Sequence, residues 1–254
     1  MVVIRMVYTS VQNNRIKEIA KLKEKKYRDQ TDLFLVEGEH LIMEAYKSGY
    51  LRTLIKEENI NFSLDVETLI VNDKVLKYIS SLKTSVSLIG ICNKKEDKVT
   101  GNHLLLLDNI QDPGNLGTII RSAVAFNVDT IILGEDCVDL YNEKVIRATQ
   151  GLIFNINIIV TNLENLIPEL RQNQYKIYAT KVTDGKSLKN IEKSEKFAII
   201  MGNEGNGISE EVGKLINRRL YIPNYPQERE TSESLNVAVA TSIVCAEFRR
   251  RLQG

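Results

Sequence analysis

The sequence predicts a two-domain α/β protein whose larger, C-terminal domain holds a mostly parallel sheet with helices on both faces. Three observations support this fold class. Short apolar runs alternate with helical stretches after residue 100, as they do in parallel sheets. A polar, charged segment at residues 93–102 separates two blocks of sequence, which differ in how regularly apolar runs and helical stretches alternate. The 254 residues, 43% of them hydrophobic, are enough for two domains of ordinary size.

The first block predicts a small α/β domain over residues 1–100. Residues 32–38 and 51–57 have the apolar pattern of strands, and residues 38–49 between them form a helical pattern that ends at Gly49. The runs LIVN and SLIGIC predict further strands.

The second block predicts a regular α/β domain over residues 101–254. Buried parallel strands read as continuous apolar runs, and helical patterns lie between them. The predicted strands are 103–108, 130–134, 155–160, 175–180 and 197–202; the predicted helices are 117–126, 141–150, 163–172 and 209–217. A last helix starts at Ser234 and is apolar nearly all round through Cys245, which predicts burial or contact with a partner subunit.

Composition excludes several classes of protein. No apolar run reaches the ~18 residues of a membrane span, and the N-terminus has no signal-peptide pattern. Three scattered Cys and two His give neither a disulfide scaffold nor a metal site, so we expect no metal. The expected location is the cytoplasm.

A basic run lies between Arg15 and Arg28, which contains seven Lys and Arg residues but only two acidic residues. On one continuous helix, four of these side chains share a face: Lys17, Lys21, Lys25 and Arg28. This face is either a stripe that contacts phosphates or an ordinary solvated surface.

Three segments with unusual polar residues follow predicted strands, where open α/β sheets bind their ligands. In residues 107–117 (LDNIQDPGNLG), Asp112 and Asn115 stand before a helix that carries Arg121; Asn115 is also a good helix N-cap. In residues 201–208 (MGNEGNGI), the glycines let a ligand approach the backbone, and Glu204 is not needed for a turn. The spacing fits neither a Rossmann fingerprint nor a P-loop.

The third segment follows the pair Ile222 and Pro223. Ser234 is a good N-cap for the last helix. Asn236 lies in the predicted first helical turn, where a buried amide needs polar partners.

Together these segments resemble the SpoU (TrmH-type) RNA ribose 2′-O-methyltransferases of the SPOUT superfamily. The resemblance lies in D-P-x-N-x-G-x-x-x-R at residues 112–121, G-x-E-x-x-G at 202–207 and I-P…S-L-N-V at 222–237, and it covers about residues 103–248. The first block resembles the RNA substrate-binding domain of two-domain members, most clearly at residues 34–41.

The resemblance implies a C-terminal trefoil knot that forms a pocket for S-adenosylmethionine, and a homodimer. It places the cofactor at Gly202, Glu204, Gly205, Ile222 and Leu235. It assigns catalysis to Asn115, Arg121, Glu204, Ser234 and Asn236. An RNA substrate would also make Lys17, Lys21, Lys25 and Arg28 phosphate contacts.

Two departures from the family pattern stand out. Ten residues, 224–233, separate Pro223 from Ser234 where relatives have a short Gly-containing turn. Residues 147–151 (RATQG) replace an R-x-S-x-G pattern and keep its hydroxyl and its glycine.

The expected reaction transfers a methyl group to a ribose 2′-hydroxyl. A guanidinium stays protonated in proteins, so we expect Arg121 to bind phosphate and stabilise developing alkoxide charge rather than to act as a base. The expected substrate is 23S rRNA. Alternatives are tRNA, a non-catalytic RNA-binding paralogue, a base methyltransferase and an NAD-binding enzyme. The sequence leaves open the nucleotide, any role in antibiotic resistance and the oligomeric state.

Overall fold

The computed structural model describes residues 7–82, 84, 86–181, 185–191, 194–223 and 234–253. The chain forms two compact units. Unit 1 contains the described residues up to Lys95 together with the segment Asp139–Phe154. Unit 2 contains Glu96–Val138 and the described residues from Asn155 onward.

Unit 1 is built on a mixed sheet in the order β1-β4-β3-β5-β2. Strand β5 runs antiparallel to both β2 and β3, whereas β4 is parallel to β3 and β1. Its strands are β1 Val7–Tyr8, β2 Leu33–Glu37, β3 Leu51–Glu57, β4 Glu67–Val71 and β5 Leu88–Asn93. Its helices are α1 Asn14–Lys21, α2 Lys25–Thr31, α3 Glu39–Lys47, α4 Asp73–Ile79, α6 Glu143–Ala148 and the 3-10 turn η1 Leu152–Phe154. The predicted strands at 32–38, 51–57, LIVN and SLIGIC correspond to β2, β3, β4 and β5, whereas β1 was not predicted.

Unit 2 holds a sheet in the order β10-β12-β9-β11-β6-β7-β8, and every described pairing in it is parallel. Its strands are β6 His103–Leu107, β7 Thr130–Leu133, β8 Asn157–Val160, β9 Lys176–Thr180, β10 Lys186–Ser187, β11 Phe197–Met201 and β12 Arg219–Tyr221. The central strands β6 and β11 are almost entirely buried. This result confirms the predicted fold class of a mostly parallel sheet.

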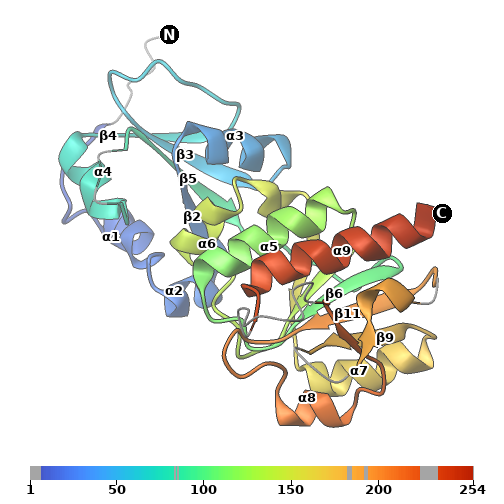
Figure 1. Cartoon of the computed structure of the whole chain (residues 1–254). Helices are drawn as coiled ribbons and strands as arrows, with labels where there is room; N and C mark the ends of the chain where they lie inside the picture. Colours follow the sequence, from blue (N-terminus) through green and yellow to red (C-terminus); the bar gives the residue numbers. More distant parts are fainter. Residues whose placement is uncertain are drawn as a thin grey trace. The chain divides into compact units, whose positions relative to one another are not determined.

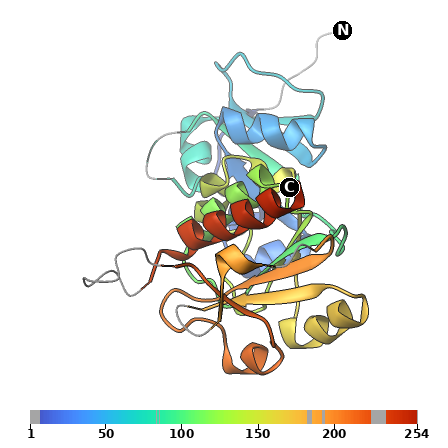
Figure 2. The same ribbon diagram turned by 45° about the vertical axis from the view of Figure 1, so that its right-hand side comes forward.

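The helices of unit 2 cover both faces of its sheet. They are α5 Pro113–Ala125, α7 Leu163–Gln172, η2 Leu188–Asn190, α8 Glu210–Lys214 and α9 Val237–Gln253. Helices α5 and α9 pack side by side on one face, and α7 and α8 lie on the other (Figures 1 and 2). The predicted threading of the C-terminal segment into a knot stays a prediction, because residues 224–233 lie outside the described residues.

The segment 139–154 belongs to unit 1 although the flanking chain belongs to unit 2. Asp139 accepts a 2.5 Å bond from the buried guanidinium of Arg28. The ring of Phe154 stacks on Tyr50, with centroids 5.6 Å apart. The expected division at residue 100 places this segment in the second domain, and the contacts place it in the first. No local sequence signal marks such long-range contacts.

The predicted continuous basic helix is wrong, because the chain breaks between α1 and α2. Leu22 ends α1, and Glu24 has the extended backbone of an N-cap. The guanidinium of Arg28 donates to the backbone oxygens of Leu22 and Lys23 at 2.8 and 2.7 Å. Arg28 is only 5% exposed, so it does not lie on a solvent-facing stripe with Lys17, Lys21 and Lys25.

Within the described residues, no helix is long and apolar enough to cross a membrane. The same residues contain no group of three or more His, Cys, Asp or Glu side chains arranged to hold a metal ion.

Candidate active site

The site lies where strands β6 and β11 end side by side in unit 2. The two strands pair in parallel from Phe197 and His103 to Met201 and Leu107. The backbone N–H of Asp108 donates to the oxygen of Met201 at 2.9 Å, which extends the ladder by one residue. The two polar segments that follow the strands therefore start next to each other.

The first segment turns into α5, and its cap differs from the sequence prediction. Asp112, not Asn115, is the N-cap: its carboxylate accepts from the N–H of Asn115 at 2.7 Å. Pro113 occupies the first helical position, where its missing N–H costs no hydrogen bond. Asn115 lies in the first turn, and its side chain is left to make other contacts.

The second segment is a tight glycine-rich loop organised by Asn203. Asn203 and Gly207 exchange backbone hydrogen bonds of 2.8 and 2.9 Å. The side-chain oxygen of Asn203 accepts from the N–H groups of Gly205 and Asn206 at 2.9 and 3.1 Å. Its side-chain amide donates to the backbone oxygen of Asn109 at 2.9 Å. One side chain thus fixes the loop and ties it to the first segment.

The third segment meets the other two through side-chain amides. Asn115 donates to the carboxylate of Glu204, and Asn236 donates to the side-chain oxygen of Asn115 at 2.9 Å. Three of the five predicted catalytic residues, from three separate segments, are therefore connected in one chain of hydrogen bonds. If the amide of Asn115 were turned round, its NH₂ group would face the NH₂ group of Asn236, and both are donors. The two hydrogen bonds therefore fix the orientation of this amide.

Asn236 also begins α9, which corrects the predicted N-cap at Ser234. Its side-chain oxygen accepts from the N–H groups of Ala238 and Val239 at 3.0 and 3.3 Å. The helix starts at Val237, three residues later than predicted. Ser234 is exposed and lies two residues before this cap.

Arg121 is not part of this chain of hydrogen bonds. It is exposed on α5, six residues and about 9 Å of helical rise from Asn115. Within the described part of the protein it makes no hydrogen bond or ion pair. Its neighbour Ser122 lies 2.7 Å from Ser242 of α9, hydroxyl to hydroxyl, which ties the two helices together. The guanidinium is thus available to a ligand, on a helix that is firmly held.

The predicted cofactor residues surround the same strand ends. Gly202 follows β11, and a side chain there would meet the backbone of Gly207 at 2.3 Å. Gly207 has a φ of +70° and open space on the side where a side chain would project. A ligand can therefore approach this backbone closely, which fits the adenosylmethionine group expected here. Ile222 is half-buried after β12 and Leu235 is 43% exposed; residues 224–233 between them lie outside the described residues.

Two site residues were missed by sequence reasoning. Asp108 is only 7% exposed, and its carboxylate accepts from the N–H of Ser209 at 2.7 Å, which closes the glycine-rich loop from the other side. Asn203 organises that loop. The available signal for Asp108 was an acidic residue directly after a buried strand. Beside them, burial raises the pKa of the Cys137 thiol to about 11, so this neighbour is a neutral thiol.

Known proteins match both parts of the chain. Residues 102–246 match the SpoU rRNA Methylase family, and residues 13–90 match the MRM3-like substrate binding domain. A Bacillus subtilis protein, 23S rRNA (guanosine(2553)-2′-O)-methyltransferase RlmP, is 37% identical over 94% of this chain and 98% of its own length.

Solved structures agree with these matches. A TrmH-family RNA methyltransferase structure from Porphyromonas gingivalis has a TM-score of 0.85 and 32% identity, over 95% of this chain and 99% of that one. An AdoMet-bound rRNA methyltransferase from Sinorhizobium meliloti has a TM-score of 0.83 and 31% identity, over 97% and 98%. The chain belongs to the SpoU rRNA methylase family of S-adenosylmethionine-dependent RNA 2′-O-methyltransferases.

Proposed function

We propose that this protein methylates a ribose 2′-hydroxyl in 23S rRNA. The observation that carries the proposal is the hydrogen-bonded chain Asn236–Asn115–Glu204, which brings the three polar segments of the site to one place. The substrate follows from the B. subtilis relative, whose name specifies guanosine 2553 of 23S rRNA. That nucleotide is therefore the first to test.

Each side chain of the site has a role that fits its chemistry. Bound adenosylmethionine supplies an activated methyl group. Arg121, positively charged and exposed, binds the phosphate next to the target ribose and stabilises the charge that develops on the 2′-oxygen. Glu204 and Asn115 hold the N-terminal end of α5, the helix on which Arg121 lies further along. Ser234 and Asn236 donate hydrogen bonds to the nucleotide or to the cofactor. Positioning of two reactants in this way can lower a barrier by roughly 7–11 kcal/mol.

The cofactor rests on backbone rather than on charged side chains. We place it against Gly202, Glu204 and Gly205 on one side and against Ile222 and Leu235 on the other. Measured adenosylmethionine binding would test it directly.

The active form is a homodimer. Helix α9 is predicted to be apolar nearly all round, yet one face of it stays open in the single chain. Val239 and Ile243, four residues apart on α9, are 49% and 38% exposed, and Leu235, two residues before the helix, is 43% exposed. A second copy of the chain would cover them. We also place the protein in the cytoplasm, where ribosomal RNA is modified.

Of the basic residues predicted to contact the RNA, Lys17 of α1 remains a candidate. Lys21 and Lys25 instead pair with the carboxylates of Glu18 and Asp29 at 2.8 and 2.7 Å. The buried Arg28 instead stabilises the folded structure of unit 1.

The decisive experiment is methyl transfer from labelled adenosylmethionine to naked 23S rRNA and, separately, to bulk tRNA, followed by nucleoside mass spectrometry. A 2′-O-methylnucleoside in the rRNA pool is the expected result. The same product in the tRNA pool alone would identify tRNA, rather than 23S rRNA, as the substrate. Cofactor binding without transfer to either RNA would point to an assembly intermediate as substrate, and absence of cofactor binding would leave a non-catalytic RNA-binding protein.

A further inference from the structure

The break between α1 and α2 brings lysines and tyrosines together on unit 1. The ammonium groups of Lys21 and Lys26, five residues apart, lie 5.2 and 5.9 Å from the centre of the Tyr27 ring. Lys23, in the turn between them, lies 5.5 Å from the ring of Tyr78 in α4 and donates to the Tyr78 backbone oxygen at 2.8 Å. We name these five residues the lysine–tyrosine surface.

The buried Arg28 fixes the shape of this surface. Its guanidinium donates to the backbone oxygens of Leu22 and Lys23 and to the carboxylate of Asp139. Two hydrogen bonds from Arg28 therefore hold the turn that projects Lys23, and the bond to Asp139 holds the guanidinium in place. A continuous helix would point Lys21 and Lys26 in different directions, since five residues correspond to about 500° of rotation.

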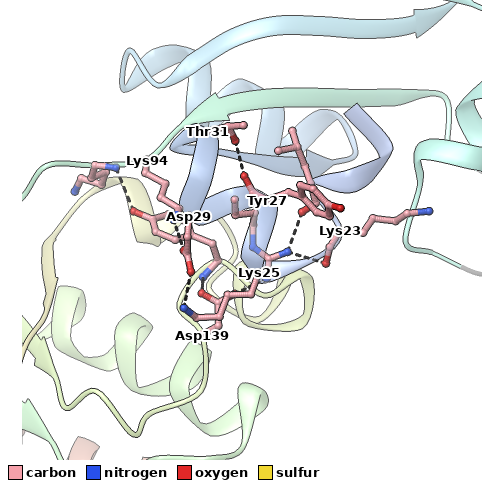
Figure 3. Close-up of polar contacts among 11 residues, drawn as sticks. Lys23, Lys25, Tyr27, Asp29, Thr31, Lys94 and Asp139 are labelled. Carbon is pink, nitrogen blue, oxygen red and sulfur yellow. Dashed lines mark hydrogen bonds and ion pairs between the residues drawn. The ribbon is translucent and has the colours of Figure 1, made fainter. Parts of the chain in front are cut away.

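Neighbouring lysines are held in a different way, by carboxylates. Asp29 accepts from both Lys25 and Lys94 at 2.7 Å (Figure 3). These two ammonium groups, Lys25 first, lower the pKa of the Asp29 carboxyl, so the group is a carboxylate at neutral pH. Lys25 therefore projects less positive charge than an unpaired lysine, because Asp29 neutralises part of the local field.

An aromatic ring holds a lysine without neutralising it. The ring attracts the ammonium through its quadrupole but carries no net charge. Lys23 and Lys26 are exposed, and in the part of the chain that the structure describes neither is paired with a carboxylate. Their full positive charge is ordered in place and open to an anion. Lys21, by contrast, is paired with Glu18.

We propose that Lys23 and Lys26, ordered by Tyr78 and Tyr27, contact phosphates of the RNA substrate, and that Lys25 does not. The inference rests on the proposed function only in taking RNA as the substrate. RNA fits this surface because a polyanion is bound by several ordered cations that need no matching shape. The surface also lies within residues 13–90, which match a substrate-binding domain.

The test is the salt dependence of RNA binding. The probe is a fluorescein-labelled transcript of the 23S rRNA segment around guanosine 2553, with affinity measured by anisotropy from 0.05 to 0.3 M KCl. For the double variant K23Q/K26Q we expect the slope of log affinity against log salt to flatten by about 1.4–1.8, two phosphate contacts. Affinity at 0.1 M KCl should fall by about 25- to 60-fold.

Two sets of matched controls make the proposal falsifiable. K25Q, which removes a lysine from the same helix, should leave the slope unchanged. Y27F/Y78F should bind as wild type because the rings remain, whereas Y27L/Y78L should bind more weakly. An unflattened slope in K23Q/K26Q, or equal flattening in K25Q, overturns the proposal. Circular dichroism checks that each variant is folded.

The outcome is separable from that of the proposed function. If the wild type binds the transcript but methylates no RNA, and K23Q/K26Q still flattens the slope, the proposed reaction fails and the phosphate contacts stand. If methylation occurs and the slope is unchanged, the reaction stands and another surface binds the RNA.

Discussion

The side-chain amide of Asn236 donates to the side-chain oxygen of Asn115 across 2.9 Å, although 121 residues separate the two in the chain. The contact joins the N-cap of α9 to the first turn of α5. It also sets the orientation of the Asn115 amide, whose nitrogen then faces Glu204. The site is thus built on two packed helix ends rather than on free loops.

This relationship predicts coupling between the two asparagines. Asn236→Ser keeps a capping hydroxyl but loses the reach to Asn115. We expect single-turnover methyl transfer to fall roughly five- to tenfold, the loss of about 1 kcal/mol. In a double-mutant cycle with Asn115→Ala, the effects should be less than additive. Fully additive effects would show that the hydrogen bond does not matter for the reaction.

Arg121 is expected to act on the reaction step. Arg121→Ala should lower kcat at saturating RNA by about 10²–10³-fold, as removal of a donor to developing negative charge does. Arg121→Lys should recover part of the loss, because charge remains and the planar fork is lost. Adenosylmethionine affinity, measured by calorimetry, should not change. Near-normal turnover of Arg121→Ala would rule out this role.

The close approach at Gly202 predicts a sensitive cofactor loop. A Cβ at Gly202 would lie 2.3 Å from the backbone of Gly207 and would force the Asn203–Gly207 bridge apart. We expect Gly202→Ala to weaken adenosylmethionine binding by tenfold or more, in line with about 1–3 kcal/mol for overpacking. Gly213→Ala is the matched control, since nothing lies within 4 Å of its Cβ position. Calorimetric titration with the cofactor measures both variants.

The buried ion pair of Arg28 predicts a stability effect. Arg28→Ala leaves Asp139 without its cation and removes two bonds to backbone oxygens. Loss of one partner of a buried pair typically costs about 3–5 kcal/mol. We expect a loss of this order in urea unfolding followed by circular dichroism. Lys25→Ala, which removes the exposed partner of Asp29, should change stability by less than about 1 kcal/mol. Similar small losses in both variants would contradict the prediction.

The end of α9 predicts a stability change in acid. Arg250, with Arg251, lowers the pKa of the Glu247 carboxyl from its ordinary 4.5 to about 2. A depressed pKa stabilises the folded state above pH 4.5, and the benefit disappears as the pH falls toward 2. Wild type and Glu247→Gln should therefore differ in Tm at pH 6, with the wild type higher. The difference should shrink between about pH 4.5 and pH 2. A constant gap would indicate that Glu247 does not act through its charge.

Several features were predictable because they depend on local sequence. Apolar runs such as 103–107 and 197–201 can only be buried strands or helix segments, and their length and spacing favoured a parallel sheet. The motifs around Asn115, Glu204 and Asn236 could be placed at strand and helix ends, because glycine, proline and capping residues mark those ends.

Other features escaped local reasoning for identifiable reasons. Both Asp112 and Asn115 are good caps, and only the geometry shows that Asp112 caps α5. Nothing between Lys21 and Lys25 is a glycine or a proline, yet α1 ends at Lys21, and the distant Arg28 side chain donates to the carbonyl oxygens of Leu22 and Lys23 in the turn that follows. The assignment of the roles to individual site residues stays a prediction.

The sequence by itself determined the fold class, most of the strands and the family. Each of these follows from short-range patterns of apolar, turn and polar residues. Only the tertiary structure decided that Asn115, Glu204 and Asn236 share one set of hydrogen bonds, that Asn203 and Asp108 fasten the loop, and that residues 139–154 pack on unit 1. Such contacts join residues that are far apart in the sequence. The arrangement of the strands and helices in the folded chain decides which of them meet, and a local sequence pattern does not contain that information.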